Sequence, residues 1–514
     1  MNARDLRSAA IIVDPINDNV AVAKFPLKNN MLLRLDDAIL LLQEDIGIGE
    51  RFAIRVIAAG EAVCQFGYPF GTSTGIGVGE RISSANVIAR LPASTRRRKW
   101  PATLKLQPEY ESLTFKGYRR SDGSCGTRNF YLVIPTSMCA SATASQIATK
   151  FTMDIQRIDG VLALPSTEGC GCAGGMQIER YLTVIRNFVL HPNVAGVLLV
   201  DLGCEQTNAS AVRSFFENTG LGKRTDLQID WLTIQREGGV AKTLQAAQLL
   251  IAARLAALGE MRRSECPISH LIIGTECGAS DAFSGISANR VIGNAVDKVI
   301  YGGGSAIMSE IPEMRGAEPF LFPRIRDRQT IDKLRHIMRW YERLTRRLGY
   351  VMDDNLVPEN RAGGLFNPYI KSLGAVMKGG TTPIEGAVEY GETIQSKGLH
   401  IMQGPGNDLE SVTGLSASGS NLICFSTGRG TVTGSAVVPV IKISSTTDLF
   451  ERMPDDIDFD AGMVLNSQDA GVSIEKTGTL LLERIISVAS GERTCAERNR
   501  QQQFQVWTAG KLSL

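Results

Sequence analysis

The stretch Ser269-His-Leu-Ile-Ile-Gly274, followed at once by Thr275-Glu-Cys-Gly-Ala-Ser-Asp281, decides the fold class of this 514-residue chain. A short apolar run that ends in a glycine-rich loop is typical of a buried strand in a parallel sheet. Further apolar runs of this kind are predicted as strands at 130–135, 161–164, 195–201, 306–308, 400–402 and 421–425. Helical segments such as 244–258 lie between them, so we expect parallel α/β layers whose ligands bind beyond the carboxyl ends of the strands.

The first 92 residues follow a different pattern. The β-rich runs 20–25, 52–57 and 62–66 are separated by glycines, which predicts a small β module. We therefore expect a multidomain α/β protein. Its predicted parts are a β module (1–92), a basic linker (93–112), an α/β domain (113–260) and a Rossmann-like α/β domain (261–514).

Composition limits the function classes. With 43% hydrophobic and 21% charged residues the chain is globular, and a net charge of +2 argues against a dedicated nucleic-acid surface. The basic run Arg96-Arg-Arg-Lys99 is interpreted as a solvated connector, with an RNA contact as the weaker alternative. No apolar run is long enough to span a membrane, and ten cysteines without a secretory leader do not predict a disulfide framework. We expect a cytoplasmic protein without a membrane or nucleic-acid partner.

Four glycine-rich loops follow predicted strands, and each places small residues where backbone N–H groups can converge on an anion. They are 166–175, 203–206, 275–281 and 426–431. Arg429, in the last of them, is able to hold a carboxylate through two hydrogen bonds. Four loops in the same position relative to a strand favour a shared site over four unrelated tight turns.

Acidic residues gather near the third loop: Glu276, Asp281, Glu310 and Glu313. Lys371 and Lys378 are candidate bases if burial lowers their pKa values. The chain contains no nucleophile elbow, phosphate-binding P-loop or zinc-protease motif, so common hydrolase chemistry is not indicated.

Several longer strings resemble the altronate/galactarate dehydratase family. They are Gly117-Tyr-Arg-Arg-Ser-Asp-Gly-Ser-Cys-Gly-Thr-Arg-Asn129, 275–289, 371–383, 411–421, Phe425-Ser-Thr-Gly-Arg-Gly430 and Gly491-Glu-Arg-Thr494. The resemblance covers nearly the whole chain, and the β module is similar to the family's SAF domain.

The resemblance implies a metal-dependent hydro-lyase that removes water from a sugar acid, an aldonate or aldarate, and leaves a 2-keto-3-deoxy acid. Such an elimination needs a group that stabilises the developing enediolate and a general acid for the leaving hydroxyl. The residues that we expect to act in catalysis are Asp281, Glu276 and Lys371. The expected substrate-binding residues are Arg128, Asn129, Ser280, Asn289, Thr427 and Arg429. The substrate would be a small hydroxy acid, the cofactor Fe²⁺, Mg²⁺ or Mn²⁺, and the assembly a homo-oligomer.

Three histidines that are usual in the family are replaced in this chain. The replacements are Gly49-Glu50-Arg51, Ser83-Ser-Ala-Asn86 and Pro165-Ser-Thr-Glu168. Glu50, Glu168 and Cys170 are therefore the predicted metal ligands, with loss of the metal site as the alternative. Two other functions stay open: a lyase with a different leaving group, such as sulfite from a sulfonated hydroxy acid, and an altered homologue that binds a ligand or partner without catalysis.

Overall fold

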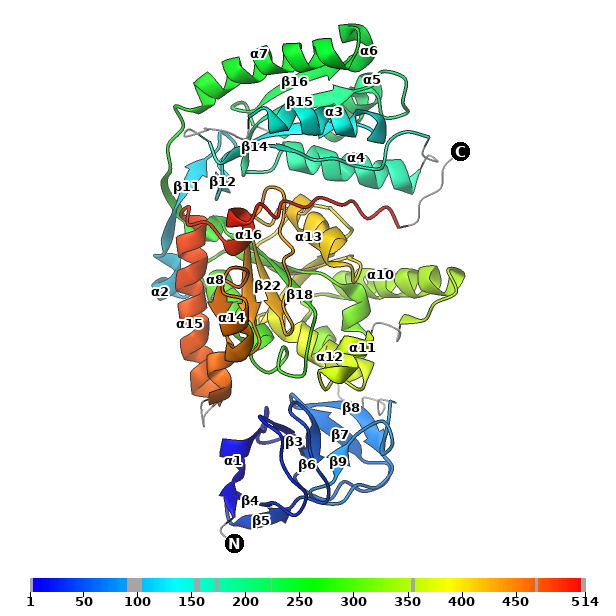
Figure 1. Ribbon diagram of the computed structural model, residues 1–514, viewed down its shortest axis with the longest axis vertical. Coiled ribbons are helices and arrows are strands. Elements are labelled where there is room, and N and C mark those ends of the chain that lie inside the picture. Colours follow the sequence, from blue (N-terminus) through cyan, green and yellow to red (C-terminus); the bar gives the residue numbers. More distant parts are fainter. Residues whose placement is uncertain are drawn as a thin grey trace.

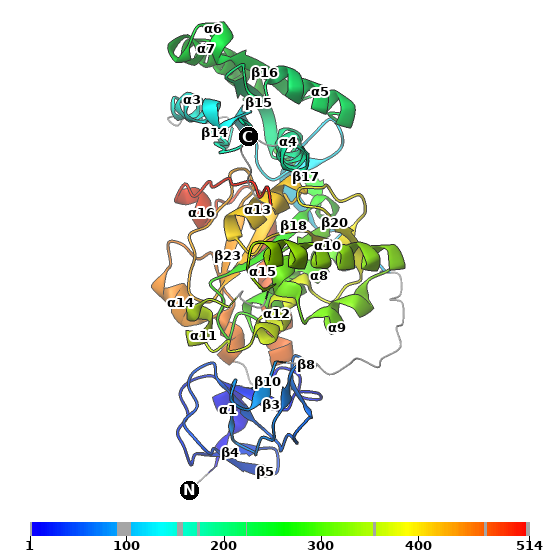
Figure 2. The same cartoon turned by 90° about the vertical axis from the view of Figure 1, so that its right-hand side faces the viewer.

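The computed structural model describes residues 3–89, 104–151, 158–171, 175–222, 224–352, 356–466 and 470–509. The three domains lie in a row, but not in the order of the sequence. The N-terminal module is at one end, the C-terminal domain lies in the middle, and the domain around residues 113–260 is at the other end (Figures 1 and 2). The basic run Arg96–Lys99 lies outside the described residues.

The N-terminal module is made of short strands in three small sheets, as predicted. The sheets have the orders β1-β4-β5, β2-β3-β6-β9 and β10-β8-β7. Their bounds are β1 Arg4–Asp5, β2 Ala10–Ile11, β3 Val20–Ala23, β4 Leu32–Leu35, β5 Ala38–Leu41, β6 Arg51–Ala53, β7 Ala62–Gln65, β8 Tyr68–Ser73, β9 Arg81–Ile82 and β10 Val87–Ile88, with one short helix, α1, at Leu6–Ala9.

The second domain is built on a four-stranded parallel sheet of order β14-β13-β15-β16. Its strands are β13 Phe130–Pro135, β14 Gly160–Ala163, β15 Val194–Asp201 and β16 Gln228–Thr233. The helices are α3 Met138–Thr149, α4 Met176–Val189, α5 Ala209–Thr219, α6 Ile234–Glu237 and α7 Val240–Leu258. All residues of β13 and β15 are buried, which explains why both strands are continuous apolar runs in the sequence.

A smaller antiparallel sheet of order β12-β11-β17 connects this domain to the next. Its strands are β11 Thr114–Arg119, β12 Cys125–Gly126 and β17 Ser264–Pro267, and helix α2 (Pro108–Glu111) precedes it. The Gln107 N–H donates to the Tyr301 carbonyl at 3.0 Å, so the end of the predicted linker is packed on the C-terminal domain and is not a free connector.

The C-terminal domain contains a seven-stranded parallel sheet of order β20-β21-β19-β18-β22-β23-β24. The strands are β18 Ile272–Gly278, β19 Ser305–Met308, β20 Ile384–Val388, β21 Gly398–Met402, β22 Leu422–Thr427, β23 Val440–Ser444 and β24 Phe459–Asp460. The helices are α8 Ala288–Tyr301, α9 Glu318–Leu321, α10 Arg328–Arg347, α11 Pro358–Ala362, α12 Pro368–Val376, α13 Asp408–Ala417, α14 Thr447–Arg452, α15 Ala470–Ala489 and α16 Cys495–Arg498. Short 3₁₀ turns lie at Ile268–His270, Ile311–Met314, Phe322–Arg324, Met377–Gly379 and Gly462–Asn466.

Two hydrophobic cores cross the domain boundaries. One joins Val20 and Phe70 of the N-terminal module to Phe283 and Leu373 of the C-terminal domain. The other joins the second domain to the middle one and includes Trp507, near the end of the chain. Because burial of apolar area stabilises each contact, these interfaces fix the positions of the side chains at the domain boundaries.

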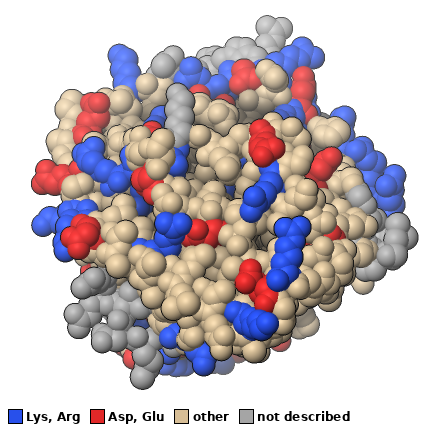
Figure 3. All heavy atoms as spheres, turned by 90° about the horizontal axis from the view of Figure 1, so that it is seen from above, with Lys and Arg blue, Asp and Glu red and all other residues tan. Residues whose placement is uncertain are grey.

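The surface carries both signs of charge. Seen from the end formed by the second domain, acidic and basic side chains are interspersed (Figure 3). Within the described ranges, no helix is both long and apolar enough to cross a membrane.

Candidate active site

The carboxyl ends of β18 and β19 bring together a largely buried group of polar and charged side chains. Lys371 Nζ lies 2.8 Å from Glu313 Oε1, and Lys378 Nζ lies 2.9 Å from Cys277 Sγ and contacts Glu310 Oε2. Cys277 Sγ lies in turn 3.1 Å from Glu313 Oε2. We call these five residues the buried cluster.

The backbone of Glu310 is held in an unusual conformation. Its φ is 72°, in the left-handed region that non-glycine residues rarely adopt. Such a residue typically costs about 1–3 kcal/mol, which the surrounding structure has to offset. The conformation turns the Glu310 side chain towards β18, where Oε2 accepts a hydrogen bond from the Cys277 N–H at 3.3 Å.

Burial and neighbouring charge set the protonation of this region. Burial, and then the negative charge of Glu310, raises the pKa of Glu276 well above its usual range. The raised pKa favours the protonated, neutral form of Glu276. The hydroxyl of Ser411 donates to Glu276 Oε2 at 2.6 Å and fixes the carboxyl group.

Lys371 and Lys378 were expected to act as bases if burial lowered their pKa values, and this condition is not met. Burial alone would lower their pKa values, but the negative groups around them outweigh it, so both pKa values are raised. Conversely, burial would raise the pKa of Glu313, yet the two lysines hold it below its usual value. Lys371 and Lys378 are thus cations at neutral pH.

Asp281 lies at the end of the loop that follows β18, and its carboxyl group is held in place. Its Oδ1 accepts from the Ser284 N–H and the Ser284 hydroxyl, both at 2.8 Å, and its Oδ2 accepts from the Ser445 hydroxyl at 3.1 Å. Burial raises its pKa in spite of these bonds. Gly428 makes the approach possible, because a Cβ there would lie 2.5 Å from Asp281 Cγ.

A cleft of about 1020 Å³ lies between the N-terminal module and the C-terminal domain, and Asp281 is part of its wall. Its basic lining residues are Arg7 and Lys24 from the module and Arg429 and Arg452 from the C-terminal domain. Arg7 and Arg452 form ion pairs with Asp36 and Asp448. Arg429 is exposed, and the described residues offer its guanidinium no acidic partner, so it is available to an anion.

A crevice of about 10 Å³ continues behind Asp281, room for about one water molecule. Its lining includes Arg51, Ser280, Asn289 and Lys371. Asp281 therefore separates the cleft, which is large enough for a sugar acid, from the buried cluster.

Sequence reasoning missed Asp408, the first residue of α13. Burial, followed by the negative charges of Glu310 and Glu313, raises its pKa to about 7. Its signal in the sequence was weak, a single acidic residue after Gly404-Pro-Gly406, at the carboxyl end of β21. The module residues Arg7, Lys24 and Arg51 were also missed, because the domain contact that brings them to the site is a tertiary feature.

The other predicted residues of the C-terminal domain are close to Asp281 and shape its surroundings. Asn289 Oδ1 accepts from the Ser426 hydroxyl at 2.5 Å, and its amide donates to the Gly374 carbonyl. Thr427 Oγ1 accepts from the Gly430 N–H at 3.0 Å and so orders the loop that carries Arg429. The Ser280 carbonyl accepts from the Asn360 amide.

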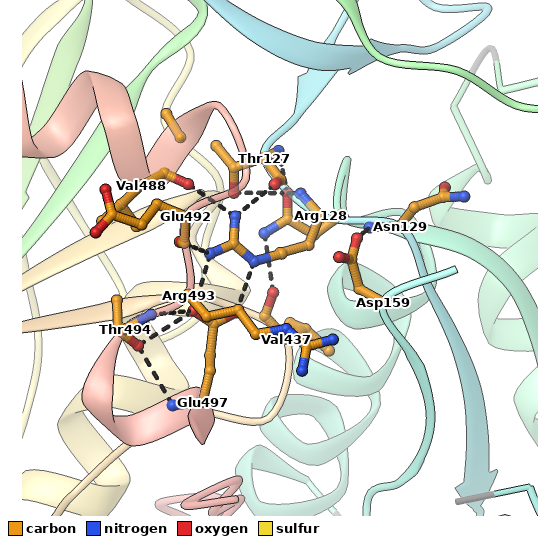
Figure 4. A network of polar contacts seen from close by, with 12 residues as sticks. Thr127, Arg128, Asn129, Asp159, Val437, Val488, Glu492, Arg493, Thr494 and Glu497 are labelled. Atoms are coloured by element: carbon orange, nitrogen blue, oxygen red, sulfur yellow. Dashed lines mark hydrogen bonds and ion pairs between the residues drawn. The ribbon is translucent and has the colours of Figure 1, made fainter. Parts of the chain in front are cut away.

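Arg128 and Asn129 lie elsewhere, at the contact between the second and C-terminal domains (Figure 4). The Arg128 guanidinium forms a two-point ion pair with Glu497, at 2.6 and 2.8 Å, and donates to the Thr127, Val488 and Glu492 carbonyls. Since all five N–H groups are used, the expected role in substrate binding is corrected to that of a domain anchor. Asn129 accepts from Arg120 and is also distant from the cleft.

The predicted metal ligands cannot meet within one chain. Glu50 belongs to the N-terminal module, whereas Glu168 and Cys170 belong to the second domain at the opposite end (Figure 1). Glu50 instead accepts from the Gly47 N–H at 2.7 Å and pairs with Arg81. The histidine replacements do not therefore define one new metal site.

The buried cluster offers a better donor set for a divalent cation. Ligand atoms of Cys277, Glu310 and Glu313 all lie within 4.8 Å of one another. One sulfur and two carboxylate oxygens suit a borderline cation such as Fe²⁺. The donors fit in type, and a cation there would replace the Lys378 ammonium.

Family models match almost the whole chain. The SAF domain model of altronate/galactarate dehydratases matches residues 8–90, and the second-domain model of D-galactarate dehydratase/altronate hydrolase matches 117–259. The C-terminal model of D-galactarate/altronate dehydratase matches 268–512. The chain belongs to the altronate/galactarate dehydratase family, and the resemblance inferred from sequence strings is confirmed.

Relatives in this family have lyase names. The chain is 32% identical to an altronate dehydratase of Bacillus subtilis (strain 168), over 96% of this chain and 97% of that protein. It is 30% identical to the galactarate dehydratase (L-threo-forming) of Escherichia coli (strain K12), over 93% and 92%. It is 28% identical to the (2R)-sulfolactate sulfo-lyase subunit beta of Chromohalobacter salexigens, over 77% of this chain and 97% of that subunit.

Proposed function

We propose that this protein is a hydro-lyase that removes water from an aldonate or aldarate and gives a 2-keto-3-deoxy acid. The observation that carries the proposal is the cleft whose wall includes both the hydrogen-bonded carboxyl group of Asp281 and the guanidinium of Arg429, which has no acidic partner among the described residues. Family membership over all three domains supports the same reaction class.

The substrate carboxylate binds to Arg429 in this proposal. The guanidinium forms two parallel hydrogen bonds to a carboxylate, and Arg7, Lys24 and Arg452 make the cleft attractive to an acid. An aldarate has two carboxylates, so the module side of the cleft is suited to the second one.

Asp281 removes the proton beside the bound carboxylate. Its Oδ1 accepts three hydrogen bonds, from the Phe283 N–H and from the N–H and hydroxyl of Ser284, which leaves Oδ2 as the oxygen that accepts the proton. The cation Lys371, which lines the crevice behind Asp281, offsets the negative charge that develops on the substrate.

The divalent metal belongs to the proposal as well. Cys277, Glu310 and Glu313 are the residues that would hold it. When bound, such an ion supplies Lewis-acid stabilisation of an enediolate. The assignment predicts that the Glu313→Gln variant retains less metal than the wild type after dialysis.

The relative named as a sulfo-lyase supports an alternative reaction, in which sulfite leaves instead of water. Loss of water is favoured here, because the relatives named as dehydratases match the whole chain, including its N-terminal module. The sulfo-lyase subunit matches only 77% of it. The module supplies Arg7 and Lys24 to the cleft.

We also propose a cytoplasmic, homo-oligomeric enzyme. None of the nine described cysteines forms a disulfide, and two of them are exposed, which suits a reducing compartment. Light scattering of the purified protein tests the oligomeric state.

A substrate panel tests the reaction. Aldonates, aldarates and sulfonated hydroxy acids are incubated anaerobically with the protein and Fe²⁺, Mn²⁺ or Mg²⁺, and both 2-keto-3-deoxy acid and sulfite are measured. The proposal expects the keto acid from a sugar acid. Release of sulfite alone would favour the alternative lyase, and no product from any compound would favour a binding protein.

A further inference from the structure

A second group of reactive side chains lies in the second domain, far from the cleft. Three connections at the carboxyl edge of its sheet each carry a cysteine: Cys139 in the first turn of α3, Cys170 in the loop after β14 and Cys204 in the loop after β15. The three strands are parallel neighbours in the order β14-β13-β15, so their loops emerge at one edge.

Hydrogen bonds tie these loops together. The Met138 N–H, next to Cys139, donates to the Glu168 carbonyl at 2.7 Å. The Thr207 hydroxyl contacts the carbonyls of both Thr136, at 2.6 Å, and Gly169, at 3.0 Å. Gly169 has φ +91° and no room for a side chain, because a Cβ would lie 2.5 Å from the Thr136 carbonyl oxygen.

The Cys139 thiol interacts with both of the other thiols, through a hydrogen bond with Cys170 and through the charge of Cys204. Cys139 and Cys204 are exposed, Cys170 is half-buried, and none forms a disulfide. The pKa of Cys139 is raised, first by a hydrogen bond with Cys170 and by burial. The negative charges of Glu205 and Cys204 raise it further. Glu205 is not available as a ligand, since its carboxylate accepts from Ser137, Leu202 and Gly203.

The three sulfurs are more widely spaced than the ligand atoms of the buried cluster. Among the described residues, the group of three ligand atoms within 4.8 Å of one another is the Cys277 set, and the three thiols do not form such a group. A wider, all-sulfur set suits a polynuclear centre, and iron–sulfur clusters are held by cysteine thiolates.

We propose that Cys139, Cys170 and Cys204 bind an iron–sulfur cluster in the second domain. Each thiol releases its proton to solvent, and each thiolate sulfur then replaces one exchangeable ligand, such as a dithiothreitol thiolate, on an iron of the incoming cluster. In a four-iron cluster, three protein thiolates leave one iron with an exchangeable ligand from solution. The site is independent of the cleft and of the proposed dehydration, so its test needs no activity measurement.

Anaerobic reconstitution tests this site. The full-length protein, purified without a histidine tag, is incubated with iron, sulfide and dithiothreitol, desalted, and analysed for iron, sulfide, visible absorption and electron paramagnetic resonance after reduction. We expect about four iron and four sulfide per chain, with cluster signals. The same analysis is applied to Cys139→Ser, Cys170→Ser and Cys204→Ser, with Cys64→Ser, in the N-terminal module, as the matched control.

The expected result is a cluster in the wild type and in Cys64→Ser, and at least a fivefold loss of iron and sulfide in each loop variant. Circular dichroism confirms that the variants are folded, and an unfolded variant is replaced by the corresponding alanine variant. Iron without sulfide, a single zinc per chain, or a cluster that persists when all three loop cysteines are replaced would each overturn the proposal.

Discussion

Lys371 Nζ lies 2.8 Å from Glu313 Oε1, and both side chains are at most 10% exposed. This buried ion pair connects the crevice behind Asp281 to Cys277 and Lys378. It also keeps Lys371 protonated, which makes the residue an electrostatic partner of the reaction instead of its base.

Replacement of one partner is expected to be costly. Glu313→Gln leaves the Lys371 ammonium buried without a counter-charge, so we predict a loss of about 3–5 kcal/mol in the free energy of unfolding. Denaturant titration measures it. The control Asp332→Asn breaks an exposed pair with Arg328 and should change stability by less than about 1 kcal/mol. Equal effects in the two variants would show that the pair is not an important part of the site.

Arg429 is predicted to bind substrate without stabilising the fold. Arg429→Gln should raise KM and lower kcat/KM by roughly 10- to 100-fold, the value of a charged hydrogen bond of about 1.5–3 kcal/mol. The thermal midpoint should stay within a degree or two of the wild type, since the side chain is exposed. Arg328→Gln, at another exposed arginine, is the control. An unchanged KM in Arg429→Gln would remove this residue from the site.

The pH dependence of stability should report Asp408. Its pKa is raised to about 7 in the folded protein, so between about pH 4 and 7 the folded state binds more protons than the unfolded state. The contribution of Asp408 is therefore present at low pH, falls as the pH rises through this range, and is constant above it. Asp408→Asn should make this decline in stability shallower, because the part that Asp408 contributes is lost, and thermal unfolding across pH 4–9 measures the change. Parallel pH profiles for the two proteins would contradict the account.

We predict that catalysis requires the space next to Asp281 that the absence of a side chain at Gly428 leaves. Gly428→Ala places a methyl group 2.5 Å from Asp281 Cγ, which forces the carboxyl away from its serine partners. We expect a loss of kcat of at least tenfold, measured by steady-state kinetics. Gly406→Ala is the matched control, because a Cβ there meets no atom within 4 Å. Full activity in Gly428→Ala would mean that the position of Asp281 is unimportant.

Arg128 should act through the fold alone. Arg128→Lys loses the two-point contact with Glu497 and carbonyl partners from both domains, so we predict a loss of stability of about 3 kcal/mol or more with an unchanged KM. Calorimetry and kinetics on the same preparation separate the two effects. A raised KM with normal stability would restore the expectation that Arg128 binds substrate.

The parallel strands were predictable because their signal is local. Phe130–Pro135 and Ala195–Asp201 were expected as buried strands, and the structure has β13 at Phe130–Pro135 and β15 at Val194–Asp201. The start of β18 was placed three residues too early, since Ile268–His270 forms a 3₁₀ turn before it.

The chemistry of the site was less accessible from the sequence. Four residues that were selected from the sequence lie in one region of the structure: Asp281, Glu276, Lys371 and Arg429. The charge state of Lys371 depends on Glu313, 58 positions earlier, and the second wall of the cleft comes from the N-terminal module. Contacts at such separations are set by domain packing, which has no periodic signal in the chain.

The most direct test of the central claim is the reaction in D₂O with the sugar acid that the substrate panel identifies. Removal of the proton beside the carboxylate and loss of the neighbouring hydroxyl give an enol, which takes one deuteron from solvent at C3. The account predicts a 2-keto-3-deoxy acid with one deuterium at C3, formed by the wild type and slowed by about 10²- to 10⁴-fold in Asp281→Asn. A product without deuterium, or an Asp281→Asn variant as fast as the wild type, would contradict it.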